Sequence, residues 1–159
     1  MGELAFDSAP VPVREVVAEA LPRVWARIGQ SGSWLTAEQR VAIAAEARNV
    51  AGCALCEERK AAVSPYAIKG DHDDLGDLPA IWIDVVHRIV SDPGRLSEHW
   101  FRQVTDGGIT TEEYVELVGV VATVVGIAVT AASFDAANWW LFTLGAAIVG
   151  LTYATIGVI

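Results

Sequence analysis

The spacing of the apolar residues is the feature that most constrains the fold of this chain. Near its start they recur three or four positions apart, as in the set Val16, Val17, Leu21, Val24, Trp25 and Ile28. That spacing places them on one face of an α-helix, whereas a half-buried strand needs strict alternation. The sequence contains no strand-like alternation of any length and no obvious internal repeat. We therefore predict an all-α protein, with a first helix from Val13 that Pro22 kinks or divides into two.

Two capping boxes mark the starts of further helices. In Thr36-Ala-Glu-Gln39, the threonine hydroxyl can accept from the amide three residues on while the glutamine side chain reaches back. An alanine-rich stretch follows, and alanine is the best helix former. We therefore expect one long helix from about Thr36 to Ala62, which Ser64-Pro65 ends. Thr110-Thr-Glu-Glu113 is the second box and opens a helix from Glu112.

The region between the two boxes alternates loops and helices. Residues 63–78 hold two glycines, one proline and four aspartates, a composition typical of a loop. These aspartates lack the spacing and the terminal glutamate of a calcium-binding loop. Residues 79–90 have helical apolar spacing and begin with a proline suited to a first turn. A turn at 91–94 precedes another helix, through Trp100, Phe101 and Val104.

The charged residues divide the chain into unequal parts. All lysines and arginines lie between Arg14 and Arg102, and beyond Glu116 the only charged residue is Asp135. The net charge of −9 argues against a nucleic-acid partner, because non-specific binding needs a basic face. The first residues lack the basic and apolar regions of a secretory signal, so we expect a cytoplasmic location. The predicted segments are an N-terminal arm (1–13), a helical domain (14–134) and an apolar C-terminal tail (135–159).

The apolar tail is long enough to cross a bilayer as a helix, which takes about 20 residues. Trp139 and Trp140 stand near its start, where an interfacial belt would lie. We therefore expect residues 136–159 to touch or enter a membrane. A buried helix at a subunit interface, or a truncated or shifted reading frame, would give the same composition. The uncharged stretch 117–134 is expected to be a helix buried in a soluble oligomer, with a second membrane span as the alternative.

The only two cysteines form the motif Cys53-Ala-Leu-Cys56. On a continuous helix they would lie about 60° apart on one face, close enough to form a disulfide after modest adjustment. In a chain with no secretory signal, this motif favours a redox pair over a structural bridge. Inert thiols in a core are an alternative.

Glu46 and His87 are the residues best suited to proton transfer. Glu46 lies seven residues before Cys53, on the same face of a continuous helix but about 10.5 Å along it, too far for a direct hydrogen bond. His87 has apolar neighbours, titrates near neutral pH, and is the candidate relay. The alternatives are a salt bridge from Glu46 to Arg48, Arg40 or a second subunit, and a satisfied core role for His87.

Three further residues are candidates for supporting roles. Lys60 follows Cys56 by four positions and can stabilise a thiolate there, although two neighbouring glutamates oppose this. His72, in the aspartate-rich loop, can cover the site or be solvated. Glu116 precedes a wholly apolar run and can face the site. His72 and His87 could complete a zinc site with the cysteines, but the spacing is not that of a usual finger, and we expect neither a metal nor a cofactor.

Taken together, these segments resemble the alkylhydroperoxidase D-like branch of the carboxymuconolactone decarboxylase superfamily, over about residues 14–130. The stretches that carry the resemblance are Leu35-Thr-Ala-Glu-Gln-Arg40, Ala42 to Cys56, Glu57-Glu-Arg-Lys-Ala61 with Ser64-Pro65, Gly70-Asp-His72, Val86-His87-Arg-Ile-Val with Asp92-Pro-Gly-Arg-Leu96, and Glu113-Tyr-Val-Glu116-Leu-Val. The later stretches are most similar to a less characterised peroxidase-related subgroup. The resemblance implies an all-α homo-oligomer with the CxxC motif on a helix near a subunit interface.

The resemblance also implies that the dithiol reduces hydroperoxides. Cys56 would be the sulfur that attacks the peroxide, Cys53 the resolving sulfur, and a lipoyl-type or other dithiol partner the reductant. The family's usual glutamate and histidine positions hold Val41 and Lys60 in this sequence. Glu46 and His87 are therefore expected to move the protons.

Two functions from different classes follow from these observations. The first is a thiol-dependent peroxidase of the cytoplasm, associated with a membrane through its tail. The second is a non-enzymatic oligomerisation or accessory module that the tail anchors to a membrane. Cofactor-free decarboxylase chemistry of the wider superfamily fits less well, because it does not need two cysteines at this spacing.

Overall fold

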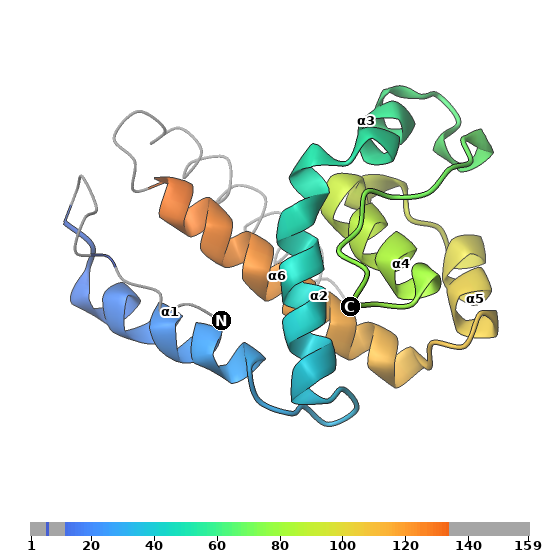
Figure 1. Ribbon diagram of the computed structural model, residues 1–159. Coiled ribbons are helices and arrows are strands. Elements are labelled where there is room, and N and C mark those ends of the chain that lie inside the picture. The colour runs from blue at the N-terminus through green and yellow to red at the C-terminus, as the bar shows by residue number, and fades with distance from the viewer. Residues whose placement is uncertain (1–5, 7–11, 134–159) are drawn as a thin grey trace, which may run out of the picture. The chain divides into compact units, whose positions relative to one another are not determined.

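A computed structural model describes Phe6 and residues 12–133 of the chain. These residues form helices and turns and contain no strand, which confirms the all-α prediction (Figure 1). The α-helices are α1 (Glu15–Ile28), α2 (Ala37–Asn49), α3 (Ala54–Ala61), α4 (Ala80–Ser91), α5 (Glu98–Asp106) and α6 (Thr111–Ser133). Three short 3-10 turns join them: η1 (Val50–Gly52), η2 (Pro65–Ala67) and η3 (Pro93–Arg95). Our expectations for the apolar tail, from Asp135 on, lie outside the described residues.

The chain separates into two compact units. The first contains Trp25–Val125, and the second contains Gly2–Val24 together with Gly126–Ile159. Every residue of the candidate site described below belongs to the first unit. The division into an arm, a helical domain and a tail stays a prediction.

The first helix, α1, runs without interruption from Glu15 to Ile28 with Pro22 inside it. The sequence allowed a kinked helix or two short helices, and the structure has a single helix. A proline inside a helix removes a single backbone hydrogen bond. The last residue of α1, Ile28, is buried in the core of the first unit.

The single long helix expected from Thr36 to Ala62 is wrong, because α2 ends at Asn49 and a 3-10 turn follows. Cys53 is extended (φ −75°, ψ 114°) and stands at the N-terminus of a separate helix, α3. The loop before α4 holds the break in place. Asp73 accepts from the Ala54 amide (2.9 Å), and its carbonyl accepts from the Asn49 side chain (2.6 Å). Helix propensity is a weak preference that such tertiary hydrogen bonds override.

Both predicted capping boxes are confirmed. The Thr36 hydroxyl accepts from the Gln39 amide (3.2 Å), and the Gln39 side chain accepts from the Thr36 amide (2.8 Å). Thr110 and Glu113 make the same reciprocal pair at the start of α6. Pro79 precedes α4, and the Ser97 hydroxyl caps α5.

The core of the first unit surrounds α4, which packs against α2 and α3. Val85 and Val86 on α4 are fully buried, among apolar side chains from α2, α3, α5 and α6. Tyr114 of α6 contacts the rings of Trp100 and Phe101 edge to face, with centroids 6.2 and 5.0 Å away. The packing of α4 against α2 and α3 places His87 next to residues of both helices.

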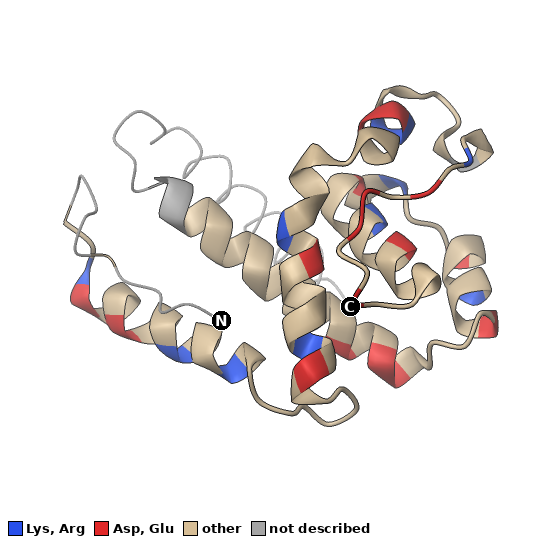
Figure 2. Cartoon of the chain, viewed as in Figure 1, with Lys and Arg blue, Asp and Glu red and all other residues tan. Residues whose placement is uncertain are grey.

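The last described helix, α6, carries acidic residues only near its start, and Figure 2 marks no charged residue along the rest of its described length. Its segment Thr111–Thr130 is long and apolar enough to cross a membrane, a test that core helices of soluble proteins also pass. Only 28% of that segment is buried. The predicted apolar helix is therefore present, and its expected burial inside an oligomer stays a prediction.

Candidate functional site

Four side chains with sulfur or imidazole groups converge inside the first unit. Cys53 and Cys56 come from the start of α3, His72 from the loop before α4, and His87 from α4 itself. One sulfur or nitrogen atom from each lies within 4.8 Å of the corresponding atoms of the other three. Both cysteines are free thiols. We call these four residues the sulfur–imidazole cluster.

One arm of the site joins a carboxylate to a sulfur through His87. Nε2 of His87 lies 2.8 Å from Oε1 of Glu46, and Nδ1 of the same ring lies 3.2 Å from Sγ of Cys56. Glu46 and His87 are 1% and 0% exposed. The Leu75 amide (3.0 Å) and the Asn49 side chain (3.1 Å) also donate to the Glu46 carboxylate. We call this chain of contacts the Glu46–His87 arm.

A second arm has the same order of groups. Nε2 of His72 lies 3.1 Å from Oδ1 of Asp84, and Nδ1 of His72 lies 3.5 Å from the sulfurs of both Cys53 and Cys56. Asp84 in turn accepts from Arg59 (2.9 Å) and from Arg88. We call this chain of contacts the Asp84–His72 arm. Each imidazole therefore turns Nδ1 toward the sulfurs and Nε2 toward a carboxylate.

The arms shift the pKa values of the groups they join. Burial raises the pKa of Cys56, but hydrogen bonding to His72 and His87 outweighs it and lowers that pKa to about 6. Burial lowers the pKa of His72, yet Asp84 and the thiols bring it up to about 10. The pKa of His87 is also raised, because Cys56 and Glu46 outweigh its burial. The pKa values of Glu46 and Asp84 lie below their usual range, since their hydrogen bonds outweigh burial.

Access to the cluster is narrow and reaches one sulfur. A cavity of about 20 Å³ is lined by Cys56 and His72 but not by Cys53. Such a volume holds roughly one water-sized molecule. Its other polar lining residues are Arg59, Arg88, Ser91, Asp92 and Arg95. Cys56 is 5% exposed and Cys53 is 0% exposed, so Cys56 is the sulfur that a small solute meets first.

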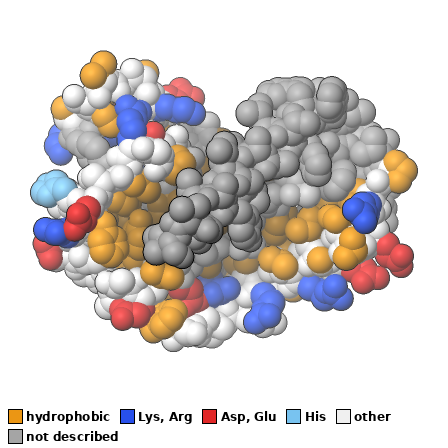
Figure 3. Space-filling view, turned by 180° about the vertical axis from the view of Figure 1, so that it is seen from behind, with side chains coloured by type: hydrophobic (Ala, Val, Ile, Leu, Met, Phe, Trp, Pro, Cys, Tyr) orange, Lys and Arg blue, Asp and Glu red, His pale blue; other side chains and the backbone are white. Residues whose placement is uncertain are grey.

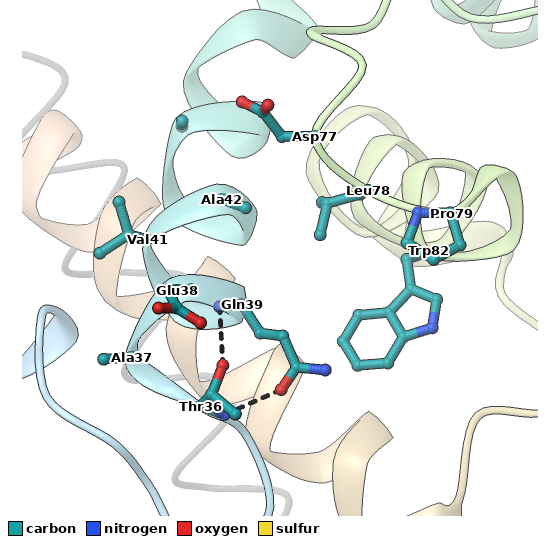
Figure 4. Close-up of a pocket in the computed structure, with 11 residues that line it drawn as sticks. Thr36, Ala37, Glu38, Gln39, Val41, Ala42, Asp77, Leu78, Pro79 and Trp82 are labelled. Carbon is teal, nitrogen blue, oxygen red and sulfur yellow. Dashed lines mark hydrogen bonds between the residues drawn. The ribbon is translucent and has the colours of Figure 1, made fainter.

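A larger groove, of about 660 Å³, lies elsewhere in the first unit. Figure 4 shows it between the first turns of α2 and the segment from Asp77 to Trp82. Gln39 and Trp82 face this groove, and no cysteine or histidine lines it. It carries none of the groups described above, so we do not assign it to the chemistry of the cluster.

The structure gathers five of the seven residues singled out from the sequence: Glu46, Cys53, Cys56, His72 and His87. His72 was expected either to cover the site or to be solvated, and its side chain is only 6% exposed. Its contacts with both sulfurs place it inside the site, so the solvated alternative is wrong.

The other two candidates lie outside the cluster. Lys60 is exposed on α3, and the cation that reaches the cluster is its neighbour Arg59, 3.2 Å from Nε2 of His72. Glu116 forms an ion pair with Arg40 and accepts from the Trp34 amide (2.8 Å). The expectation that Glu116 faces the site is therefore wrong. Glu116 ties the start of α6 to Arg40 on α2 and to Trp34 in the segment before α2.

Sequence reasoning missed Asp84, Arg59 and Asp73. Asp84 lies three residues before His87, so the two side chains lie on nearly the same face of α4. That spacing could have identified Asp84 from the sequence. Arg59 lies three residues after Cys56 in the same way. Asp73 gave no local signal, because its partners on α2 and α3 lie about 20 positions away in the sequence.

Comparison with known proteins gives no match to this chain, whether with family models, curated proteins or solved structures. The function is therefore inferred from the geometry of the cluster and its two arms.

Proposed function

We propose that this protein is a thiol-dependent peroxidase that reduces hydroperoxides through a Cys53/Cys56 dithiol–disulfide cycle. The observation that carries the proposal is the Glu46–His87 arm, which sets a buried carboxylate and an imidazole in line with the Cys56 sulfur. A nucleophilic thiol needs a base within hydrogen-bond reach, and the base needs a third group that orients it. All three are present in that order.

In the first step, His87 takes the proton of the Cys56 thiol and the resulting thiolate attacks the terminal oxygen of the hydroperoxide. The O–O bond breaks as the S–O bond forms, so sulfur is oxidised to a sulfenic acid and the peroxide is reduced by two electrons. The leaving alkoxide, or hydroxide, takes the proton from His87 and departs as an alcohol or water. The Glu46 carboxylate stabilises the imidazolium in between.

In the second step, the Cys53 sulfur attacks the sulfenic sulfur of Cys56. The S–S bond forms, the S–O bond breaks, and the hydroxyl leaves as water with the proton that Cys53 gives up. An external dithiol then reduces the disulfide by two thiol–disulfide exchanges and is itself oxidised to a disulfide. The cycle consumes one hydroperoxide and one dithiol and returns the protein to its reduced form.

Access and burial support specific partners for this cycle. The cavity at Cys56 has room for about one water-sized molecule, which suits hydrogen peroxide or the terminal group of a small hydroperoxide. Cys53 is fully buried, so the reductant meets the disulfide at Cys56. From the resemblance to alkylhydroperoxidase D-like proteins, we further propose that the protein is a homo-oligomer located in the cytoplasm and that its reductant is of the lipoyl type.

Turnover with hydrogen peroxide and a small dithiol tests the proposal. The full-length protein should consume peroxide, Cys56→Ser should abolish consumption, and Cys53→Ser should form a sulfenic acid that a carbon nucleophile traps on Cys56. His99→Gln is the matched control, because His99 is the third histidine, is exposed, and lies on α5 away from the cluster. Full turnover by Cys56→Ser would refute the mechanism.

The exposed apolar surface favours a second candidate function. Only 28% of the segment Thr111–Thr130 of α6 is buried, and Val115 on it is 58% exposed. Figure 3 shows hydrophobic side chains reaching the surface on the face it draws. A non-enzymatic module that meets a membrane through this surface would require detergent for extraction, and one that meets another copy would form an oligomer in solution. Neither would consume peroxide.

A further inference from the structure

The dithiol cycle uses only one of the two arms that reach the sulfurs. The Glu46–His87 arm supplies its base, whereas the Asp84–His72 arm contacts both sulfurs at 3.5 Å and transfers no proton in the cycle. Both rings present Nδ1 to the sulfurs, His72 to both and His87 to Cys56. Two imidazoles that are held by carboxylates and face two thiols suit a second role besides proton transfer.

The distances inside the sulfur–imidazole cluster are those of a tetrahedral ligand set. Zinc bonds of about 2.3 Å to sulfur and 2.0–2.1 Å to nitrogen put neighbouring sulfur and nitrogen atoms about 3.6 Å apart at tetrahedral angles. Three of the four sulfur–nitrogen pairs in the cluster lie 3.5, 3.5 and 3.2 Å apart. All four ligand atoms lie within 4.8 Å of one another. A small ion therefore fits among them with little rearrangement.

The two carboxylates complete the pattern around that ligand set. A histidine that binds a metal usually donates its other ring N–H to a carboxylate, which fixes the tautomer and the ring orientation. Glu46 holds Nε2 of His87 and Asp84 holds Nε2 of His72, which directs both Nδ1 atoms at the sulfurs. A cation that binds there displaces the protons that the thiols and Nδ1 carry. Arg59 and Arg88 balance the charge of Asp84.

Charge and burial indicate which ion the cluster suits. Two thiolates and two neutral imidazoles carry a charge of −2, which a divalent cation neutralises. Soft sulfur with imidazole nitrogen selects zinc-like ions over magnesium or calcium. Cys53, Cys56 and His87 are each at most 5% exposed and the His72 side chain is 6% exposed, so the protein supplies all four positions, as in closed structural zinc sites.

We infer that Cys53, Cys56, His72 and His87 form a tetrahedral binding site for a divalent zinc-type cation in the reduced protein. The bound ion engages the sulfur lone pairs, so the metal-loaded protein resists peroxide and alkylating agents. The disulfide form contains no thiolate ligand and therefore does not bind the ion. Metal binding is a separate claim from the proposed peroxidase cycle, although the two use the same sulfurs.

Cobalt(II) is the probe for this site, because tetrahedral thiolate-bound cobalt gives intense visible bands and a sulfur-to-metal charge-transfer band. Reduced, metal-stripped full-length protein should develop both at one equivalent of cobalt, and one equivalent of zinc should remove them. His72→Gln should lose the tetrahedral spectrum, whereas His99→Gln should titrate like wild type. Asp84→Asn keeps all four ligands and should weaken binding by about 10–100-fold.

Circular dichroism and thermal unfolding of each variant ensure that a lost spectrum does not reflect a lost fold. Only weak octahedral cobalt bands in folded wild type, or an unchanged spectrum in folded His72→Gln, would overturn the inference. Binding of cobalt by a protein that never reacts with peroxide refutes the proposed function alone. Peroxide turnover by a protein that binds no cobalt refutes the metal site alone.

Discussion

Replacing the buried carboxylate of Glu46 by its neutral isostere tests the role of the Glu46–His87 arm. The Glu46 side chain accepts from Nε2 of His87 (2.8 Å), from Asn49 (3.1 Å) and from the Leu75 amide (3.0 Å). Glu46→Gln keeps the shape but has one acceptor oxygen. If that oxygen faces Leu75, an N–H₂ group faces His87 and Asn49. If the amide is flipped, its oxygen faces His87 and Asn49, and the Leu75 amide loses its acceptor.

In the first orientation the amide cannot accept from Nε2 of His87, so the neutral ring carries its proton on Nδ1 and can no longer accept from the Cys56 thiol. In the second orientation the proton stays on Nε2, but the charge that stabilises the His87 imidazolium is lost. General-base catalysis contributes about 10²–10⁴-fold, and an amide in place of the carboxylate that orients a catalytic histidine costs up to about 10⁴. We expect the rate constant for Cys56 oxidation to fall within this range. Unfolding free energy should fall by about 1.5–3 kcal/mol, the usual contribution of a charged hydrogen bond.

The assay is stopped-flow loss of thiol after hydrogen peroxide is added to reduced, metal-stripped protein. Glu38→Gln is the matched control, because Glu38 lies on the same helix and is exposed. Nitrogen NMR of the imidazole rings gives a signature that general loosening would not produce, namely a change in the protonation of the His87 ring nitrogens. A folded Glu46→Gln protein with an oxidation rate within twofold of wild type would refute the reasoning.

Three further predictions concern stability. Hydrogen bonds from Arg40 and from two backbone amides outweigh burial and lower the pKa of Glu116. The ionised carboxylate therefore stabilises the fold above about pH 4.3, and this stabilisation is lost as pH falls through the lower pKa of the folded state. Urea titrations should show Glu116→Gln about 2 kcal/mol less stable than wild type at pH 7, and the two proteins should converge in acid. A methyl group on Gly32 would overlap the Glu116 carboxylate and crowd Arg40, so Gly32→Ala should destabilise the protein by a similar amount. A double-mutant cycle with Glu116→Ala should show strong coupling, and additive effects would contradict this prediction. Thr36→Ala removes the N-cap of α2 and should cost about 1 kcal/mol, whereas an unchanged midpoint would argue against the cap.

The parts of the fold that local chemistry determines could be predicted from the sequence. Thr36 and Thr110 stand at the starts of α2 and α6, and Pro79 precedes α4, because caps and prolines act on the residues next to them. The absence of strand alternation predicted the all-α class for the same reason. These features need no knowledge of distant contacts.

The break before Cys53 could not be predicted in this way. Alanine-rich sequence favours a continuous helix, and the bonds that hold the break come from Asp73, far along the chain. The break places Cys53 at the N-terminus of α3 and Cys56 within its first turn. The prediction of His87 as a relay rested on a straight helix, and His87 nevertheless lies between Glu46 and Cys56 because α4 packs against both α2 and α3.

The misplacement of Glu116 and His72 has a related cause. An acid before an apolar run suggested a functional site, but Arg40 and the Trp34 and Leu35 amides satisfy Glu116 from about 80 positions away in the sequence. A histidine among aspartates suggested a solvated loop, but Asp84 on the next helix draws His72 inward. In both cases the partner, not the neighbouring sequence, determines where the side chain lies.

The most direct test of the central claim is the rate at which stoichiometric hydrogen peroxide forms the Cys53–Cys56 disulfide in the reduced, metal-stripped, full-length protein. The arrangement of Cys56, His87 and Glu46 predicts a rate at least about 10²-fold above that of a free thiol at the same pH, with one disulfide formed per peroxide. A rate no faster than that of a free thiol would contradict the account.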